Sequence, residues 1–257
     1  MGAVARIIGR TAAALTLLVL APTPDLTPDL ALDLAHGPAR AWAAQPPDRA
    51  PDTMAARVLA CAACHGDHGQ GTKDDYFPRL AGKPADYLYN QLVAFRDGRR
   101  RYAPMNYLLE YLPDSYLREI AQFFAGEHPP YPTPEPSPAS KTVLARGKTL
   151  VTSGDPAREI PACANCHGPN FTGMEPAIPG LVGLHANYIS AQLGAWRYGT
   201  RTATAPDCMQ IVAGHLTEAD VTAIAAYLSS LPAPADPSPV SYGSLPMPLS
   251  CGSETLK

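Results

Sequence analysis

The sequence has no excess of positive charge. Its 257 residues include 20 Lys or Arg and 23 Asp or Glu, which gives a formal net charge of −3, and the two halves do not differ markedly in charge. Domains that bind nucleic acid usually gather Lys and Arg on one face. We therefore expect no nucleic-acid partner.

The sequence also has no apolar run of the ~20 residues that a membrane-spanning helix needs. The apolar stretch Thr11 to Leu20 follows Arg6 and Arg10 and is much shorter than that. With the small-x-small tripeptide Ala41-Trp42-Ala43, it predicts a signal peptide over residues 1–43, export to the periplasm and no integral span in the mature chain. The long segment before the tripeptide leaves the cleavage position open, and a retained N-terminal anchor is the alternative.

A regular alternation of apolar and polar residues, which is typical of a half-buried strand, is absent as well. Apolar residues instead recur at i, i+4 and i+7, which lines one face of a helix. The sets are Leu88, Leu92 and Phe95 in the first half and Ile189, Leu193 and Trp196 in the second. These patterns predict an all-α fold.

The pentapeptide Cys-x-x-Cys-His, in contrast, is present twice, at residues 61–65 and 163–167. It is the attachment signal of c-type haem, in which two thiols reach the two vinyl groups and the histidine lies under the iron. We therefore expect two haem c groups. Their attachment residues are Cys61, Cys64, Cys163 and Cys166, and their proximal iron ligands are His65 and His167.

A zinc site or a redox dithiol can also use a Cys-x-x-Cys pair. Zinc would need further ligands at metal-site spacing, and a thioredoxin-like dithiol needs a βαβ context. The sequence shows neither pattern. Export also agrees with covalent haem attachment, which, like a stable disulfide, belongs outside the reducing cytoplasm.

A methionine follows each proximal histidine by about forty residues. Met105 lies 40 residues after His65, and Met209 lies 42 residues after His167. His/Met ligation raises the reduction potential of a haem and suits electron transfer. We expect both methionines to be the sixth iron ligands, each in a loop between two helices.

Two alternatives to these ligands stay open, because methionine is also a common core residue. Met174 follows the second haem motif by only seven residues and has no counterpart in the first half. Bis-histidine ligation through His128 or His215 is the second alternative.

A proline also follows each proximal histidine at nearly the same distance. Pro78 lies 13 residues after His65, and Pro179 lies 12 residues after His167. Metal-bound histidines usually donate their second ring N–H to a fixed acceptor. Because the spacing recurs, we expect the two proline carbonyls to accept these hydrogens; ordinary loop prolines are the alternative.

The chain resembles itself at an offset of 101 to 104 residues, which indicates two homologous units. Tyr87, Gln91, Leu92, Phe95, Arg96, Gly98 and Arg100 align with Tyr188, Gln192, Leu193, Trp196, Arg197, Gly199 and Arg201. We expect helical domains at residues 53–126 and 141–231. A proline-rich, extended linker at 127–140 would join them, and a proline-rich, irregular tail would occupy 232–257.

Two cysteines, Cys208 and Cys251, are not used by the haem motifs. In an oxidising compartment an even remainder indicates one disulfide. This bond would pin the tail near Met209 and cover part of the second haem pocket. Free thiols or a bond to another chain are the alternatives, because spacing does not test the geometry of a disulfide.

A basic run, Arg99-Arg100-Arg101, follows Arg96 in the first unit. Such a run is usually a solvated face. It could also pair with haem propionates or steer an acidic partner toward the protein.

With these residues assembled, the sequence resembles the dihaem cytochrome c4 family. The likeness rests on CxxCHG, Phe-Pro-Arg-Leu-Ala-Gly, Tyr-Leu-x-x-Gln-Leu-x-x-Phe-Arg-x-Gly-x-Arg, a methionine and a closing helix, and it covers about Ala55 to Leu231. It implies two cytochrome c-like helical domains, each enclosing one haem, with the propionates facing one another across a pseudo-twofold interface. The chain departs from the family in its long linker, its tail and the Cys208/Cys251 pair.

We expect a periplasmic carrier of single electrons between a respiratory donor, such as a cytochrome bc1-type complex, and a terminal oxidase or another acceptor. The protein need only supply ligands, burial and orientation, because iron does the redox work. The alternative is the electron-accepting cytochrome subunit of a flavoprotein or quinoprotein dehydrogenase. A dihaem peroxidase would need one iron with an open position. Two methionine ligands, one for each iron, argue against such an enzyme. We therefore expect no catalytic residues.

Overall fold

The computed structural model describes residues 52–134 and 136–254. The signal peptide predicted at residues 1–43 lies outside these ranges. Within them, each helix is too short or too polar to cross a bilayer.

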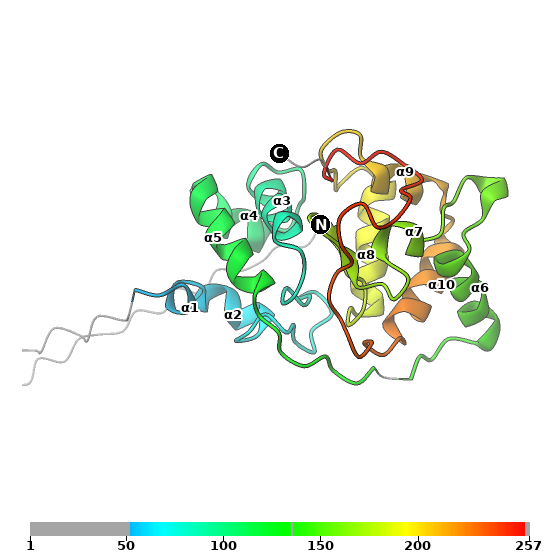
Figure 1. The fold of residues 1–257 in the computed structure, drawn as a ribbon, viewed down its shortest axis with the longest axis horizontal. Helices are drawn as coiled ribbons and strands as arrows, with labels where there is room; N and C mark the ends of the chain where they lie inside the picture. The colour runs from blue at the N-terminus through cyan, green and yellow to red at the C-terminus, as the bar shows by residue number, and fades with distance from the viewer. Residues whose placement is uncertain (1–51, 135, 255–257) are drawn as a thin grey trace, which may run out of the picture. The chain divides into compact units, whose positions relative to one another are not determined.

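The first repeat consists of helices joined by loops (Figure 1). Its core forms where α3 packs against α5, with Leu88 and Phe95 of α3 and Leu117 and Phe124 of α5 buried in one cluster. The helices of this repeat are α1 (Met54–Arg57), α2 (Leu59–His65), α3 (Ala85–Arg96), α4 (Ala103–Leu109) and α5 (Asp114–Ala125).

The second repeat places α10 against both α6 and α8. Gly147 of α6 lets that helix approach α10 closely, because a Cβ atom at this position would clash with the Ala223 carbonyl oxygen. The elements are α6 (Lys141–Thr152), the 3₁₀ turn η2 (Pro156–Arg158), α7 (Ala164–His167), β1 (Gly173–Met174), β2 (Ile178–Pro179), α8 (Ala186–Arg197), α9 (Cys208–His215) and α10 (Glu218–Ser229).

The expected all-α class is confirmed, with one addition. The two-residue strands β1 and β2 pair antiparallel, with Met174 opposite Ile178. Two residues are too few for an alternating pattern to show in the sequence.

The predicted helix ends follow from local chemistry. Thr217 caps α10, because its side chain accepts a hydrogen bond from the Asp220 N–H, and the Asp220 carboxylate accepts one from the Thr217 N–H. This reciprocal pair is a capping box. Gly98 and Gly199 follow the C-terminal residues of α3 and α8 with φ angles of 73° and 67°, a left-handed conformation that glycine adopts readily.

The linker between the repeats is held by Arg79. Its guanidinium donates to the carbonyl oxygens of Pro129 and Pro130, at 2.6 and 3.2 Å, and lies 3.8 Å from the centre of the Tyr131 ring. The Tyr131 ring also lies against Gly183 of the second repeat. The proline-rich segment is therefore attached to both repeats.

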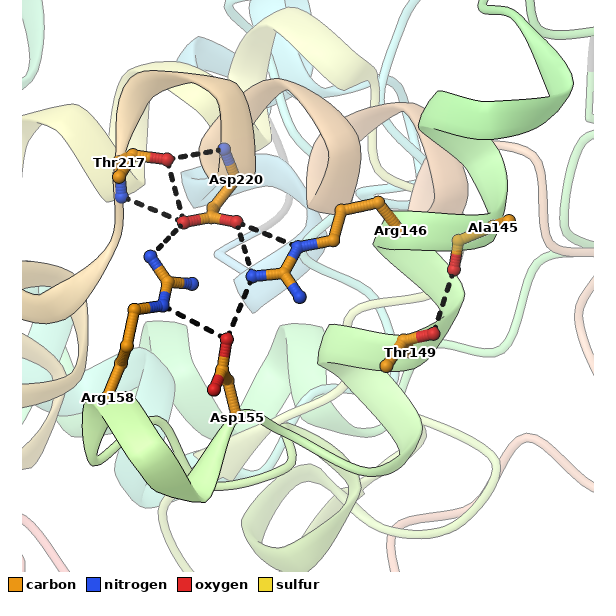
Figure 2. Close-up of polar contacts among 7 residues, drawn as sticks. All are labelled: Ala145, Arg146, Thr149, Asp155, Arg158, Thr217 and Asp220. Atoms are coloured by element: carbon orange, nitrogen blue, oxygen red, sulfur yellow. Dashed lines mark hydrogen bonds and ion pairs between the residues drawn. The ribbon is translucent and has the colours of Figure 1, made fainter.

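Figure 2 shows an ion-pair network that joins α10 to α6 and η2. The Asp220 carboxylate accepts hydrogen bonds from Arg146 at 2.9 Å and from Arg158 at 2.8 Å. Both guanidiniums also donate to Asp155 at 3.0 Å. The Asp220 side chain is only 5% exposed, so its charge depends on these partners.

We expect Asp220→Asn to lower the free energy of unfolding by about 3 kcal/mol, the low end for a broken buried pair, because both arginines are partly exposed. The melting temperature should fall by roughly 6–12 °C. Circular dichroism during heating at pH 7 measures this. Asp114→Asn is the control. It breaks the ion pair between Arg96 and the Asp114 carboxylate, which is 63% exposed, and should lower the free energy of unfolding by less than about 1 kcal/mol. Equal losses in the two variants would contradict a structural role for the buried network.

The same network predicts a dependence on pH. Burial opposes ionisation of Asp220, but hydrogen bonds from Arg158 and Thr217 outweigh it and hold its pKa well below the usual value. A carboxyl whose pKa is lower in the folded state contributes its stability above the unfolded pKa of about 3.9, and this is lost as the pH falls toward the folded value. The difference in melting temperature between wild type and Asp220→Asn should therefore shrink between pH 5 and pH 2.

Candidate haem-binding sites

The first Cys-x-x-Cys-His motif forms the end of α2. Cys61 and Cys64 are three residues apart on this helix, which puts their side chains on one face. Gly66 then ends the helix with φ 83°, and Gly168 follows the second motif with φ 85°. A residue with a Cβ would be strained at these angles, so the glycine after each histidine is part of the motif's geometry.

Both histidines have a fixed orientation. His65 Nδ1 lies 2.9 Å from the Pro78 carbonyl oxygen, and His167 Nδ1 lies 2.8 Å from that of Pro179. A carbonyl oxygen can only accept, so each Nδ1 carries the hydrogen and each Nε2 has a free lone pair. Burial lowers the pKa of both imidazoles, which favours the neutral, metal-binding form.

The second repeat encloses a large apolar cavity between its two candidate axial ligands. Cys163, Cys166 and His167 line it, and so does Met209 of α9. Its empty volume is about 1480 Å³, a figure that includes the open space at its mouth. Without an attached haem, burial raises the pKa of the Cys163 thiol to about 12 and that of the Cys166 thiol to about 11.

In the first repeat, Cys61 and Met105 pack against the same buried cluster. The expectation that Met105 and Met209 lie in loops is wrong. Met105 lies within the first turn of α4 and Met209 within the first turn of α9. Pro104 lies in the first turn of α4, a position where proline is common. Pro206 lies outside α9, just before its N-cap Asp207.

The alternative ligands lie elsewhere. Met174 is 1% exposed and belongs to β1, where it pairs with Ile178 rather than lining the cavity. His128 and His215 are exposed on the surface. The geometry therefore favours Met209 over Met174 and over a histidine.

The basic run of the first repeat is not simply a solvated face. Arg100 is 8% exposed, and it donates to Gln91 of its own repeat and to Tyr188 and Gln192 of the second. Its counterpart Arg201 is 4% exposed and donates to the same two glutamines, at 2.7 Å each. Arg101 is the one residue of the run that is exposed, and Arg99 is partly buried. The repeat alignment held a signal for this, because Arg100 and Arg201 occupy equivalent positions.

The surroundings of Arg100 and Arg201 indicate whether a haem would fit the two sites. Burial, together with the like charge of Arg100, lowers the pKa of Arg201 to about 10, so Arg201 is charged at neutral pH. Among the described residues, both guanidiniums bond only to neutral side chains. The buried Nε1 of Trp196, which lines the second cavity, also has no described acceptor. A group that brings carboxylates to this boundary, as haem does with its propionates, fits these donors.

Lys83 also lines the second cavity, although it belongs to the first repeat. Its Nζ donates to the Gly180 carbonyl oxygen at 2.8 Å. Burial, assisted by nearby Arg79, lowers the pKa of Lys83 to about 7. The sequence held no signal for this contact, because the aligned position in the second repeat is Leu184.

The tail lies along the second repeat. Cys251 forms a disulfide with Cys208, the residue before Met209, with 5.1 Å between their Cα atoms. Leu249, Cys251 and Ser253 line the second cavity. The tail thus forms part of the wall of the second site.

Comparison with known proteins agrees with this geometry. The cytochrome c family model matches residues 54–115 and 144–232. The thiosulfate dehydrogenase electron acceptor of Thiomonas intermedia is 38% identical over 192 residues, 74% of this chain and 83% of that protein. Cytochrome c4 of Pseudomonas aeruginosa is 36% identical over 178 residues, 68% of this chain and 86% of that protein. The crystal structure of reduced cytochrome c4 from Pseudomonas stutzeri matches with a TM-score of 0.61 and 31% identity, over 69% of this chain and 96% of that one.

The family model matches both repeats, and the relatives are similar across both. The protein therefore carries two covalently attached haems in two cytochrome c-like domains and transfers electrons. The chain belongs to the dihaem cytochrome c4 family.

Proposed function

We propose that each iron is six-coordinate, with His65 and Met105 as the ligands of the first haem and His167 and Met209 as those of the second. The observation that supports this most directly is the second cavity, which His167 and Met209 both line. The carbonyls of Pro78 and Pro179 then hold the two imidazoles in orientation, as outer partners of metal-bound histidines usually do.

The proposed ligation makes the protein a carrier rather than an enzyme. Haem supplies a one-electron couple, and a methionine ligand raises its potential. With both axial positions filled by the chain, neither iron offers a site for peroxide. The residues around the haems bind these groups, hold them in orientation and exclude water from them.

We place the protein in the periplasm, with haem domains at residues 53–126 and 141–231. The domain boundaries are supported by α5, which ends at Ala125, and by α6, which begins at Lys141. The partners on this proposal are a respiratory donor and a terminal oxidase or another acceptor.

A redox-titrated visible and near-infrared spectrum of the purified protein tests this proposal. Two low-spin haems, each with the weak methionine-to-ferric-iron band near the red end, are the expected result. A high-spin haem without that band, or turnover of peroxide by the isolated protein, would contradict it.

A second candidate function is that of the electron acceptor of a dehydrogenase. It is supported by the 38% identity to a protein named for accepting electrons from thiosulfate dehydrogenase. Stopped-flow mixing of the oxidised protein with such an enzyme and thiosulfate separates the candidates. Reduction within the enzyme's turnover time would favour the acceptor, whereas fast oxidation of the reduced protein by a terminal oxidase, without reaction with the enzyme, would favour the respiratory carrier.

A further inference from the structure

The helices that carry the two candidate methionines are held in place by different contacts. In the first repeat the holding residue is Asn106, which follows Met105. Its Nδ2 donates to the carbonyl oxygens of Phe95 and Arg100, and its Oδ1 accepts from the Tyr102 N–H at 2.9 Å. These bonds tie the first turn of α4 to the end of α3.

The second repeat does not use this contact. The residue after Met209 is Gln210, whose side chain is exposed. Asp207 caps α9 by accepting from the Gln210 N–H at 3.1 Å. Asp207 also accepts from the Ala203 N–H at 2.6 Å. A covalent attachment is added at the residue before the methionine, where Cys208 is bonded to Cys251 of the tail. The Gly252 N–H also donates to the Pro206 carbonyl oxygen at 2.9 Å.

The tail is attached at a second place, on the histidine side of the cavity. The Val240 N–H donates to the Gly173 carbonyl oxygen, and the Val240 carbonyl accepts from the Glu175 N–H, both at 2.9 Å. Gly173 belongs to β1, which pairs with β2, and β2 contains Pro179, the acceptor for His167. The tail therefore connects the segment that orients His167 to the helix that carries Met209.

We propose that the Cys208–Cys251 disulfide is a positioning device for Met209, with the same task that Asn106 has for Met105. The inference rests on the proposed function, because it takes Met209 as an iron ligand. A methionine side chain has three rotatable bonds, so a thioether ligand depends on a backbone that is held in place. The tail supplies this constraint in the second domain only, so the two irons depend on different residues.

The test compares Cys208→Ser/Cys251→Ser with Asn106→Ala in the purified ferric protein. The double serine variant avoids a free Cys208 thiol beside the iron. The probes are the methionine-to-ferric-iron band and binding of imidazole, which competes for the sixth position. Loss of an outer partner typically weakens a metal site 10- to 100-fold, so we expect imidazole to bind one haem at least ten times more tightly in each variant. Met105→Ala and Met209→Ala spectra identify which haem is affected.

The double serine variant should affect only the second haem, and Asn106→Ala only the first. An unchanged helical circular dichroism signal shows in each case that both domains are folded. Tyr242→Ala changes a tail residue that is 52% exposed and does not line the cavity, so it should leave both haems unchanged.

Two results would overturn the inference, and only the second of them would also overturn the proposed ligation. If Met209→Ala removes half of the band while the double serine variant binds imidazole as wild type does, the tail does not position Met209 and the proposed ligation stands. If Met209→Ala itself changes nothing, the ligand assignment fails and the positioning role fails with it.

Discussion

Replacing Met209 with alanine is expected to remove the methionine-to-iron band from one haem and leave the other intact. Met209 lines the second cavity together with His167, whereas Met105 packs in the core of the first repeat. Loss of a thioether ligand removes the effect that raises the potential of a His/Met haem. We expect the potential of the second haem to fall by on the order of 0.1 V, a fraction of the ~0.8 V over which axial ligands set haem potentials.

The measurement is a spectroscopic redox titration, in which the two haems of the variant should titrate as two well-separated steps. Met105→Ala should give the mirror result, with the first haem shifted. Met174→Leu is the control, because Met174 is buried in β1 away from the cavity. A titration of Met209→Ala that matches wild type, or a band lost in Met174→Leu, would contradict the assignment.

Replacing Arg201 with glutamine is expected to lower both haem potentials, that of the second haem more. Arg201 lines the second cavity and is 4% exposed, and Arg100 is its equivalent in the first repeat. A buried positive charge favours the reduced iron, because reduction lowers the positive charge of the haem. A unit charge about 10 Å away, at an effective dielectric constant of about 20, is worth roughly 1.7 kcal/mol, or on the order of 70 mV.

Two variants separate charge from geometry in this prediction. Arg101→Gln removes an exposed charge from the same basic run and should shift the potentials much less, because water and salt screen it. Arg201→Lys keeps the positive charge but loses the guanidinium group that donates to both Gln91 and Gln192. The haem potentials should therefore stay close to the wild-type values, while the hydrogen bonds between the two repeats are weakened. Equal shifts in Arg201→Gln and Arg101→Gln would show that burial of Arg201 does not matter for the haems.

The fold class and the two covalent haems were predictable because their signals are local or repeated. The Cys-x-x-Cys-His motif puts attachment and ligation in five consecutive residues. Helix faces and helix ends follow from spacing and capping, as at Thr217 and Gly98. The internal repeat added independent support, since each pattern occurs twice.

The sequence predicted loops at Met105 and Met209, but both residues lie in the first turn of a helix. Pro104 and Pro206 precede the two methionines, and proline fits both a loop and the start of a helix. Packing decides between them. In the structure, the Asn106 side chain holds the first turn of α4 and Asp207 caps α9.

The sequence by itself determined the haem attachment, the helical repeats and the family, because these depend on residues that are close in the chain or occur in both halves. Only the tertiary structure decided that Arg100 is buried, that Lys83 reaches the second cavity and that the tail joins both sides of that site. Those contacts link residues from 43 to 97 positions apart. No local pattern specifies such pairs, because they depend on how the helices and the tail pack around the haem sites.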